Sequence, residues 1–201
     1  MTDVSQAAIG EVETLAYAGA PAELRLEIAR LQERAYGASD GSRDAPQSQP
    51  LHDPVLNTQA FFMRADGRVI SYAGVVTKRI QHGAQTFSMS GLACVATDPD
   101  CQRQGLARRV VAAATRHMAH SGVDLGVFTC APHLAALYGD AGGWPIAPAV
   151  VLIGSQAQGA LTSSSLGVVV LMRLFSQRAQ AASATLLHGT LDLDLPLGQF
   201  L

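Results

Sequence analysis

A turn flanked by small residues has the composition and spacing to bind a negatively charged group. Segment 92–109 begins as an apolar run that favours a β-strand, breaks at Pro99, and continues as a helical pattern. Gly105 and Ala107 leave little side chain over the first helical turn, so its unpaired backbone N–H groups can contact an anion directly. The pattern therefore predicts strand, turn and helix, with a helix start suited to a diphosphate.

Three arginines stand in or next to this turn: Arg103, Arg108 and Arg109. Their positive charge favours phosphate more than the start of a helix does by itself. The alternative interpretation is an ordinary strand-to-helix junction with solvated arginines, because a short glycine-containing motif is weak evidence when taken alone.

Gln102, Gly105 and Ala107 fit the pattern Gln/Arg-x-x-Gly-x-Gly/Ala, and through it the segment resembles motif A of the GNAT superfamily of N-acetyltransferases. In that family this loop holds the pyrophosphate of acetyl-CoA, and the strand before it hydrogen-bonds the pantetheine arm. No metal is expected, because Cys94, Cys101 and Cys130 form no CxxC pair. The resemblance implies acetyl-CoA as cosubstrate and cofactor contacts at Val95, Ala96, Thr97, Gln102, Arg103, Gln104, Gly105, Leu106, Ala107 and Arg108.

A second segment, 130–144, looks like motif B of the same superfamily, which usually reads Ala-x-x-Leu-Tyr-x-x-x-Gly-Phe. Leu137 and Tyr138 take the Leu-Tyr place. Two departures stand out: the small residue Ala135 is one position late, and the Gly-aromatic pair ends one position late at Trp144. The order and distance after motif A make the joint assignment stronger than either motif.

Acetyl transfer to an amine requires a stabilised oxyanion and a proton for the departing thiolate. By position in the family, the Val95 N–H is the candidate oxyanion donor. Tyr138 is the candidate general acid, because a phenol with a reference pKa of about 10 stays protonated at neutral pH; a merely packed ring is its alternative. Cys130 is expected near the thioester end of the cofactor, without a nucleophilic role, since no paired base is visible.

The general base stays open. The family often uses a carboxylate acting through water, but segment 90–97 contains no Asp or Glu. The remaining candidates are Asp40, Asp44, His52, Asp53, Asp192, Asp194 and the C-terminal carboxylate.

The acceptor is also open. Segment 85–153 is more weakly similar to the aminoglycoside 2′-N-acetyltransferases. This similarity implies that the acceptor is a primary amine of a small molecule, such as an aminoglycoside antibiotic, and that the protein has a role in antibiotic resistance. Ala93 stands near the place of a carboxylate in that class, which counts against a pocket of that design. Alternatives are an amino-acid or polyamine metabolite, a protein amine, or a non-catalytic acyl-CoA-binding module.

Composition narrows the class of protein. The 201 residues are 48% hydrophobic, which favours one domain spanning 1–201, with the acetyl-CoA motif at 92–122, motif B at 123–145 and C-terminal strands and tail at 150–201. Fourteen Lys and Arg against 16 Asp and Glu, without a basic block, argue against nucleic acid. No apolar run or leader pattern indicates a membrane or export, so we expect a cytoplasmic protein, with a homodimer left open.

The elements that must position these residues follow from periodicity. An amphipathic helix is expected over 21–36, and strands over 59–65, 68–79 and 85–97 form an antiparallel meander that ends at motif A. Segment 37–57, rich in Gly, Ser and Pro, is a mobile loop or a lid. Further strands are expected at 11–17, 125–129, 150–153, 166–174 and 191–195. The resemblance implies the GNAT fold, a mixed, mostly antiparallel sheet of about seven strands flanked by helices.

Overall fold

A computed structural model describes residues 10–37 and 51–201. A six-stranded sheet in the order β1-β2-β3-β4-β5-β7 forms its centre, and only the β4–β5 pair is parallel. The strands are β1 (Glu13–Ala16), β2 (Gln59–Ala65), β3 (Arg68–His82), β4 (Gln85–Thr97), β5 (Leu125–Cys130) and β7 (Val169–Leu174). The predicted mixed, mostly antiparallel sheet is confirmed.

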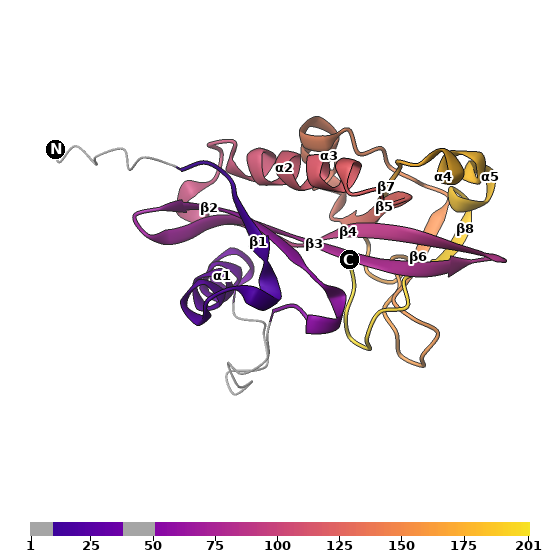
Figure 1. Cartoon of the computed structure of the whole chain (residues 1–201), viewed down its shortest axis with the longest axis horizontal. Coiled ribbons are helices and arrows are strands. Elements are labelled where there is room, and N and C mark those ends of the chain that lie inside the picture. Colours follow the sequence, from indigo (N-terminus) through magenta and orange to yellow (C-terminus); the bar gives the residue numbers. More distant parts are fainter. Residues whose placement is uncertain (1–9, 38–50) are drawn as a thin grey trace.

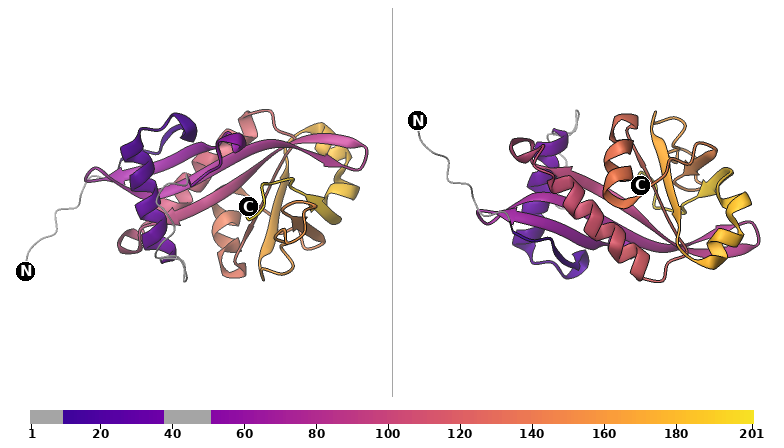
Figure 2. Two further views of the ribbon diagram at one scale, coloured as in Figure 1. Left: turned by 90° about the horizontal axis from the view of Figure 1, so that it is seen from below. Right: turned by 90° about the horizontal axis from the view of Figure 1, so that it is seen from above.

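Helices cover both faces of this sheet (Figure 1). Helix α1 (Ala22–Tyr36) lies on one face, where Leu24, Ile28 and Leu31 pack against β2 and β3, at the spacing expected of one helical stripe. Helices α2 (Leu106–His120) and α3 (Ala135–Gly142) lie next to each other on the opposite face (Figure 2). The sheet therefore separates two hydrophobic clusters.

The shorter elements connect these layers. Single 3₁₀ turns precede α1, β2, α2 and α3; they are η1 (Tyr17–Gly19), η2 (Pro54–Leu56), η3 (Pro99–Cys101) and η4 (Pro132–Leu134). Two short helices, α4 (Gln177–Ala181) and α5 (Ser183–Leu186), follow β7. Pro54, Pro99 and Pro132 each begin such a turn, where the missing N–H costs nothing.

Strands β4 and β5 separate soon after they meet. Their ladder consists of Met89 opposite Leu125 and Ser90 opposite Gly126. Beyond those pairs, β4 continues to Thr97 and β5 to Cys130 without a shared register. The backbone edge of β4 that leads into the predicted cofactor turn is therefore left without a partner strand.

The central sheet has six strands, where the resemblance implied about seven. Strands β6 (Val150–Ile153) and β8 (Gly189–Asp192) pair with each other in a separate parallel ladder. The reason lies at the free edge of β7, where segment 145–147 already forms backbone hydrogen bonds, Ala147 N–H to the Val170 carbonyl and Met172 N–H to the Pro145 carbonyl. With that edge occupied, the last strand pairs with β6.

Most predicted boundaries agree with the structure to within three residues. The strand expected at 166–174 begins at Val169, and the strand expected at 68–79 extends to His82. Of the predicted 37–57 loop, residues 38–50 lie outside the described part, together with Asp40 and Asp44. Its described end carries η2 and the buried His52.

Candidate functional site

The predicted cofactor turn leads into a helix start that no side chain caps. Gly105 occupies the N-cap position of α2 with a φ of 76°, a left-handed conformation that glycine adopts without strain. A Cβ built on Gly105 would meet no heavy atom within 4 Å, so the space above the turn is open. The first N–H groups of α2 therefore remain available to an anion.

The arginines near this turn are used in different ways. Arg108 forms an exposed ion pair with Asp140 at 2.8 Å, which joins α2 to α3, and Arg109 donates to the Gly10 carbonyl at 3.0 Å. Arg103 lies in the turn itself, in a left-handed conformation, and forms no ion pair among the described residues. Of the three predicted cations, only Arg108 is thus paired with a carboxylate among the described residues, and the charges of Arg103 and Arg109 have no ionic partner there.

Strand β4 contains a bulge just before the turn. Gly74 of β3 pairs with Ala93 and Tyr72 pairs with Ala96, so that Cys94 and Val95 together face one residue of β3. Cys94 has a φ of 54°, an unfavourable value for a residue with a side chain. Strained backbone of this kind concentrates at functional sites, where the surroundings hold it in place.

Helix α1 supplies those surroundings. The Gln32 side-chain amide donates to the Cys94 carbonyl at 2.8 Å, and the Tyr36 hydroxyl, one helical turn later, donates to the Val95 carbonyl. In a trans peptide the C=O and the following N–H point in opposite directions. Because the Cys94 carbonyl points to Gln32, the Val95 N–H points away from α1, which is the orientation its predicted role as oxyanion donor requires.

The same helix also fixes the start of the turn. Arg34 forms an ion pair with the Asp98 carboxylate at 2.9 Å, and Asp98 is buried. The other carboxylate oxygen of Asp98 accepts the Asp100 N–H at 3.1 Å. A buried carboxylate is stable only with such partners, so this pair sets the position of the turn relative to α1.

Tyr138 lies in the hydrophobic cluster under α3, packed edge-on against Phe128 with 5.0 Å between ring centroids. Burial raises its pKa, and the nearby Tyr36 phenol and Cys130 thiol add to the effect. Tyr138 therefore stays protonated at neutral pH. The structure gathers Tyr36, Cys130 and Tyr138 around the gap between β4 and β5, while their contacts with cosubstrate stay predictions.

Cys130 is a buried, free thiol at the end of β5. Burial raises its pKa to about 11, which keeps it in the unreactive thiol form. That Cys130 lines the cosubstrate site without acting as a nucleophile stays a prediction.

The tail of the chain closes the narrow end of the gap between β4 and β5. The Leu201 carbonyl accepts the Thr129 N–H at 3.0 Å and also the Thr129 hydroxyl. The Leu201 side chain packs over Gly91, where an added Cβ would come within 2.6 Å of it. Leu201 thus contacts both β5 and β4, through Thr129 and Gly91.

The candidates for the general base separate by position. Asp194 is exposed and pairs with Lys78, and Asp192 accepts from Gln156, both near β8. Asp53 caps η2 through the Val55 N–H. His52, in contrast, is buried, with its Nε2 2.7 Å from the Tyr72 hydroxyl.

Sequence reasoning missed several residues of this site. Gln32 and Tyr36 were assigned to a packing helix, and their four-residue spacing toward the sheet was the only available signal. Thr129 and Leu201 have no sequence signal of this kind, because nothing local in the sequence shows that the tail returns to β5. The pair Arg34 and Asp98 was equally invisible, since the two residues are 64 positions apart.

Other features bear on the class of protein. Among residues 10–37 and 51–201, no three His, Cys, Asp or Glu side chains gather as a group that could hold a metal ion. Within the same part of the chain, no helix is long and apolar enough to cross a membrane.

The comparison with protein families gives one match. Residues 20–147 match a family model described as an acetyltransferase (GNAT) domain. This range includes α1, the bulge, the turn and the Tyr138 helix. No curated protein matches the sequence.

Solved structures with the same fold include a GNAT family N-acetyltransferase from Escherichia coli in complex with CoA, with a TM-score of 0.59 and 17% identity over 90% of this chain and 89% of that one. An acyl-CoA N-acyltransferase from Pseudomonas aeruginosa has a TM-score of 0.56 and 13% identity over 82% of this chain and 99% of that one. A probable N-acyltransferase from Enterococcus faecalis has a TM-score of 0.51 and 14% identity over 68% of this chain and only 33% of that chain. The chain thus spans about a third of the Enterococcus protein, and such low identities establish the fold alone.

Proposed function

The chain belongs to the GNAT acetyltransferase family, and from this premise we propose that it transfers an acetyl group from acetyl-CoA directly to a primary amine of a small molecule. The observation that carries the proposal is the continuous strip formed by the unpaired edge of β4, the bulge at Val95 and the uncapped start of α2 at Gly105. Backbone N–H groups along this strip suit a ligand that combines an amide-containing arm with a diphosphate.

In the proposed reaction the acceptor nitrogen attacks the thioester carbonyl carbon. The Val95 N–H, held by the Gln32 contact to the preceding carbonyl, stabilises the negative charge that develops on the carbonyl oxygen. The carbon–sulfur bond then breaks, and Tyr138 donates its proton to the departing thiolate. The amine proton leaves to solvent or to a base. Burial raises the pKa of Tyr138, so its hydroxyl is protonated before each turnover; the same shift makes it a weaker acid, so the role requires the thiolate within hydrogen-bond reach.

The acceptor follows less directly from the site. An aminoglycoside, which the weaker resemblance of segment 85–153 suggests, carries several positive charges and calls for several acidic groups. The acidic groups that the described part of the chain places near the bulge are already engaged, since Asp98 pairs with Arg34 and Asp53 caps η2. A small amine with fewer positive charges fits these surroundings better, and a cytoplasmic enzyme, as a monomer or a homodimer, remains our expectation.

Thiol release from acetyl-CoA tests the function. We would measure it with 4,4′-dithiodipyridine across aminoglycosides, polyamines, amino acids and peptides. Release that depends on one class of amine, with the acetylated amine found by mass spectrometry, is the expected result. CoA binding by calorimetry without release for any amine would instead indicate an acyl-CoA-binding module.

A further inference from the structure

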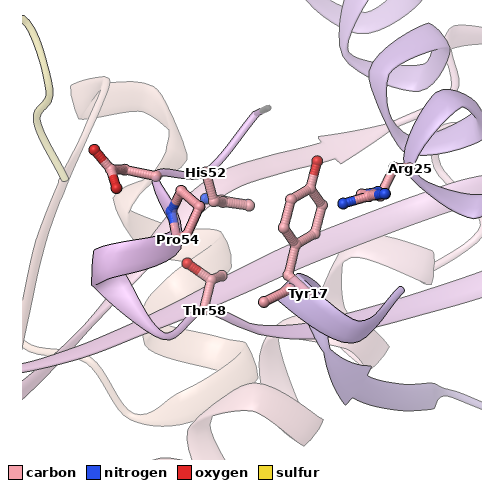
Figure 3. A pocket seen from close by; sticks show the side chains of 7 residues that line it. Tyr17, Arg25, His52, Pro54 and Thr58 are labelled. Atoms are coloured by element: carbon pink, nitrogen blue, oxygen red, sulfur yellow. The ribbon is translucent and has the colours of Figure 1, made fainter. Parts of the chain in front are cut away.

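A cavity of about 190 Å³ opens beside α1, which contributes Arg25 to its lining. Helix α1 lies on the face of the sheet opposite α2 and α3 (Figure 1). The lining of the cavity comes from three separate parts of the chain: Tyr17, Ala18, Arg25, His52, Asp53, Pro54 and Thr58. None of these residues takes part in the predicted cofactor strip. Figure 3 shows the Tyr17 ring between Arg25 on one side and His52 and Thr58 on the other.

This cavity lies close to the bulge. The His52 imidazole sits directly over Gly74, where an added Cβ would come within 2.8 Å of its ring. Gly74 pairs with Ala93 of β4, the residue immediately before the bulge at Cys94. Since paired strands lie about 5 Å apart, His52 is roughly one strand away from the position at which the acetyl group would react. The cavity can therefore hold the far end of a small acceptor.

The polar groups of the lining are mostly hydrogen-bond donors. Thr58 is 4% exposed, and its hydroxyl has no hydrogen-bond partner among the described residues, an unusual state for a buried polar atom. Arg25 is a permanent cation with five N–H donors and forms no ion pair with a described carboxylate.

His52 adds to this set in one of its tautomers. If the Tyr72 hydroxyl donates to Nε2, the other ring nitrogen of His52 carries its proton and becomes a donor. The ring is uncharged at neutral pH because burial lowers its pKa to about 4. The one acidic group of the lining, Asp53, already accepts the Val55 N–H at 2.9 Å.

We propose that this cavity, lined by Arg25, His52 and Thr58, binds a carboxylate carried by the acceptor, so that the substrate is an amine of the amino-acid class. The proposal rests on the proposed acetyl transfer and names its substrate class. Arg25 balances the charge of the carboxylate, and the buried Thr58 hydroxyl gains a partner that the free protein lacks. The amino group then extends past His52 toward the bulge.

Matched pairs of acceptors test this directly. We would compare each amino acid with its own carboxamide, which removes the charge and keeps the amine, and measure thiol release. The expected result is a kcat/KM at least about 10-fold higher for the carboxylate, as for other lost charge-assisted contacts. At a given pH a larger fraction of the carboxamide's amine is neutral, which by itself raises its kcat/KM. This effect opposes the expected preference for the carboxylate.

Two variants locate the effect. Arg25→Gln should lower kcat/KM for the carboxylate by about 10-fold, leave the carboxamide unchanged and leave the KM for acetyl-CoA unchanged. Thr58→Val should also weaken the acceptor, while the Tm stays the same or rises because an unpartnered hydroxyl is removed. Arg30→Gln is the matched control, since Arg30 is on the same helix but pairs with Glu27.

The outcomes separate the two proposals. Equal turnover of carboxylates and carboxamides, or a preference for polyamines or aminoglycosides, overturns the carboxylate site and leaves acetyl transfer intact. If no amine releases thiol, acetyl transfer itself fails, and calorimetry of amino acids with CoA-saturated protein decides the cavity. In that case, amino-acid binding that is lost in Arg25→Gln supports the site. Absence of any binding that depends on the carboxylate overturns it.

Discussion

The two faces of the sheet are equipped in different ways. On the side of α2, the predicted cofactor strip consists of backbone groups from one continuous segment, with Gly105 and the unpaired edge of β4 as its main features. On the side of α1, the cavity is built from side chains that are far apart in the sequence, among them Tyr17, His52 and Thr58. The predicted cosubstrate site thus depends on backbone groups, whereas the proposed acceptor site depends on side chains.

The two faces meet at the bulge in β4. Gln32 and Tyr36 of α1 donate hydrogen bonds to the carbonyls of Cys94 and Val95, so the face proposed to receive the acceptor also orients the backbone predicted to bind the cosubstrate. Changes on one face should therefore affect the other only through this contact. The following predictions test that separation.

The largest effect is expected at Gly105. Gly105→Glu places a carboxylate in the open space above the turn, and two like charges about 4 Å apart near a protein surface repel by about 4 kcal/mol. We expect CoA affinity, measured by calorimetry, to fall by about 1,000-fold. Gly105→Ala is the control, because its Cβ meets nothing and adds only a left-handed backbone cost of about 1 kcal/mol. Unchanged affinity in the Glu variant would remove the turn from the cosubstrate site.

The next effect concerns the stability of the α1 face. The pKa of His52 falls from 6.5 when unfolded to about 4 when folded, because burial disfavours the charged ring. Between these pH values the unfolded chain binds the additional proton, so the stabilisation present above pH 6.5 is lost as the pH falls to about 4, by roughly 3 kcal/mol. Denaturant unfolding between pH 4 and 7 measures it.

His52→Gln provides the comparison for that pH series. Its stability should vary less with pH over the same interval, since glutamine does not titrate. If the parent and the variant lose stability in parallel, other groups account for the acid sensitivity and His52 does not titrate as described.

On the α2 face, Tyr138→Phe removes the predicted acid without changing the packing against Phe128. We expect kcat to fall by about 100-fold, the size usual for general acid catalysis, with little change in the KM for acetyl-CoA. Steady-state kinetics measures both. Tyr36→Phe removes the other nearby phenol together with its hydrogen bond to the Val95 carbonyl, so a much smaller fall in kcat in that variant would assign the effect to Tyr138. Full activity in the Tyr138 variant would leave the thiolate to be protonated by another donor.

The smallest effect tests the contact between the faces. Gln32→Leu removes the hydrogen bond to the Cys94 carbonyl, so the Val95 N–H loses its fixed direction. We expect kcat to fall by about 10-fold while CoA affinity stays constant, because an oxyanion donor acts mainly in the transition state. Glu33→Gln, the next residue on α1, is the control. A loss of CoA affinity equal to the loss of kcat would instead mean that the whole strip has moved.

Much of the α2 face could be read from the sequence. Strand β4, the turn and α2 are consecutive, so the small residues Gly105 and Ala107 and the preceding apolar run were sufficient to predict them. Helix α1 was likewise clear from its apolar stripe. The resemblance to the acetyltransferases, which gave the class of reaction, rested on these same local patterns and is supported by the family match over residues 20–147.

The tertiary structure alone decided the rest. Local patterns could not show that Leu201 returns to Thr129, that His52 lies over Gly74, or that α1 orients the bulge, because each contact joins residues at least 20 positions apart. They also could not show that segment 145–147 occupies the edge of β7 and keeps β8 out of the central sheet. Backbone sites formed by one continuous segment are encoded locally, whereas side-chain sites depend on how the whole chain packs.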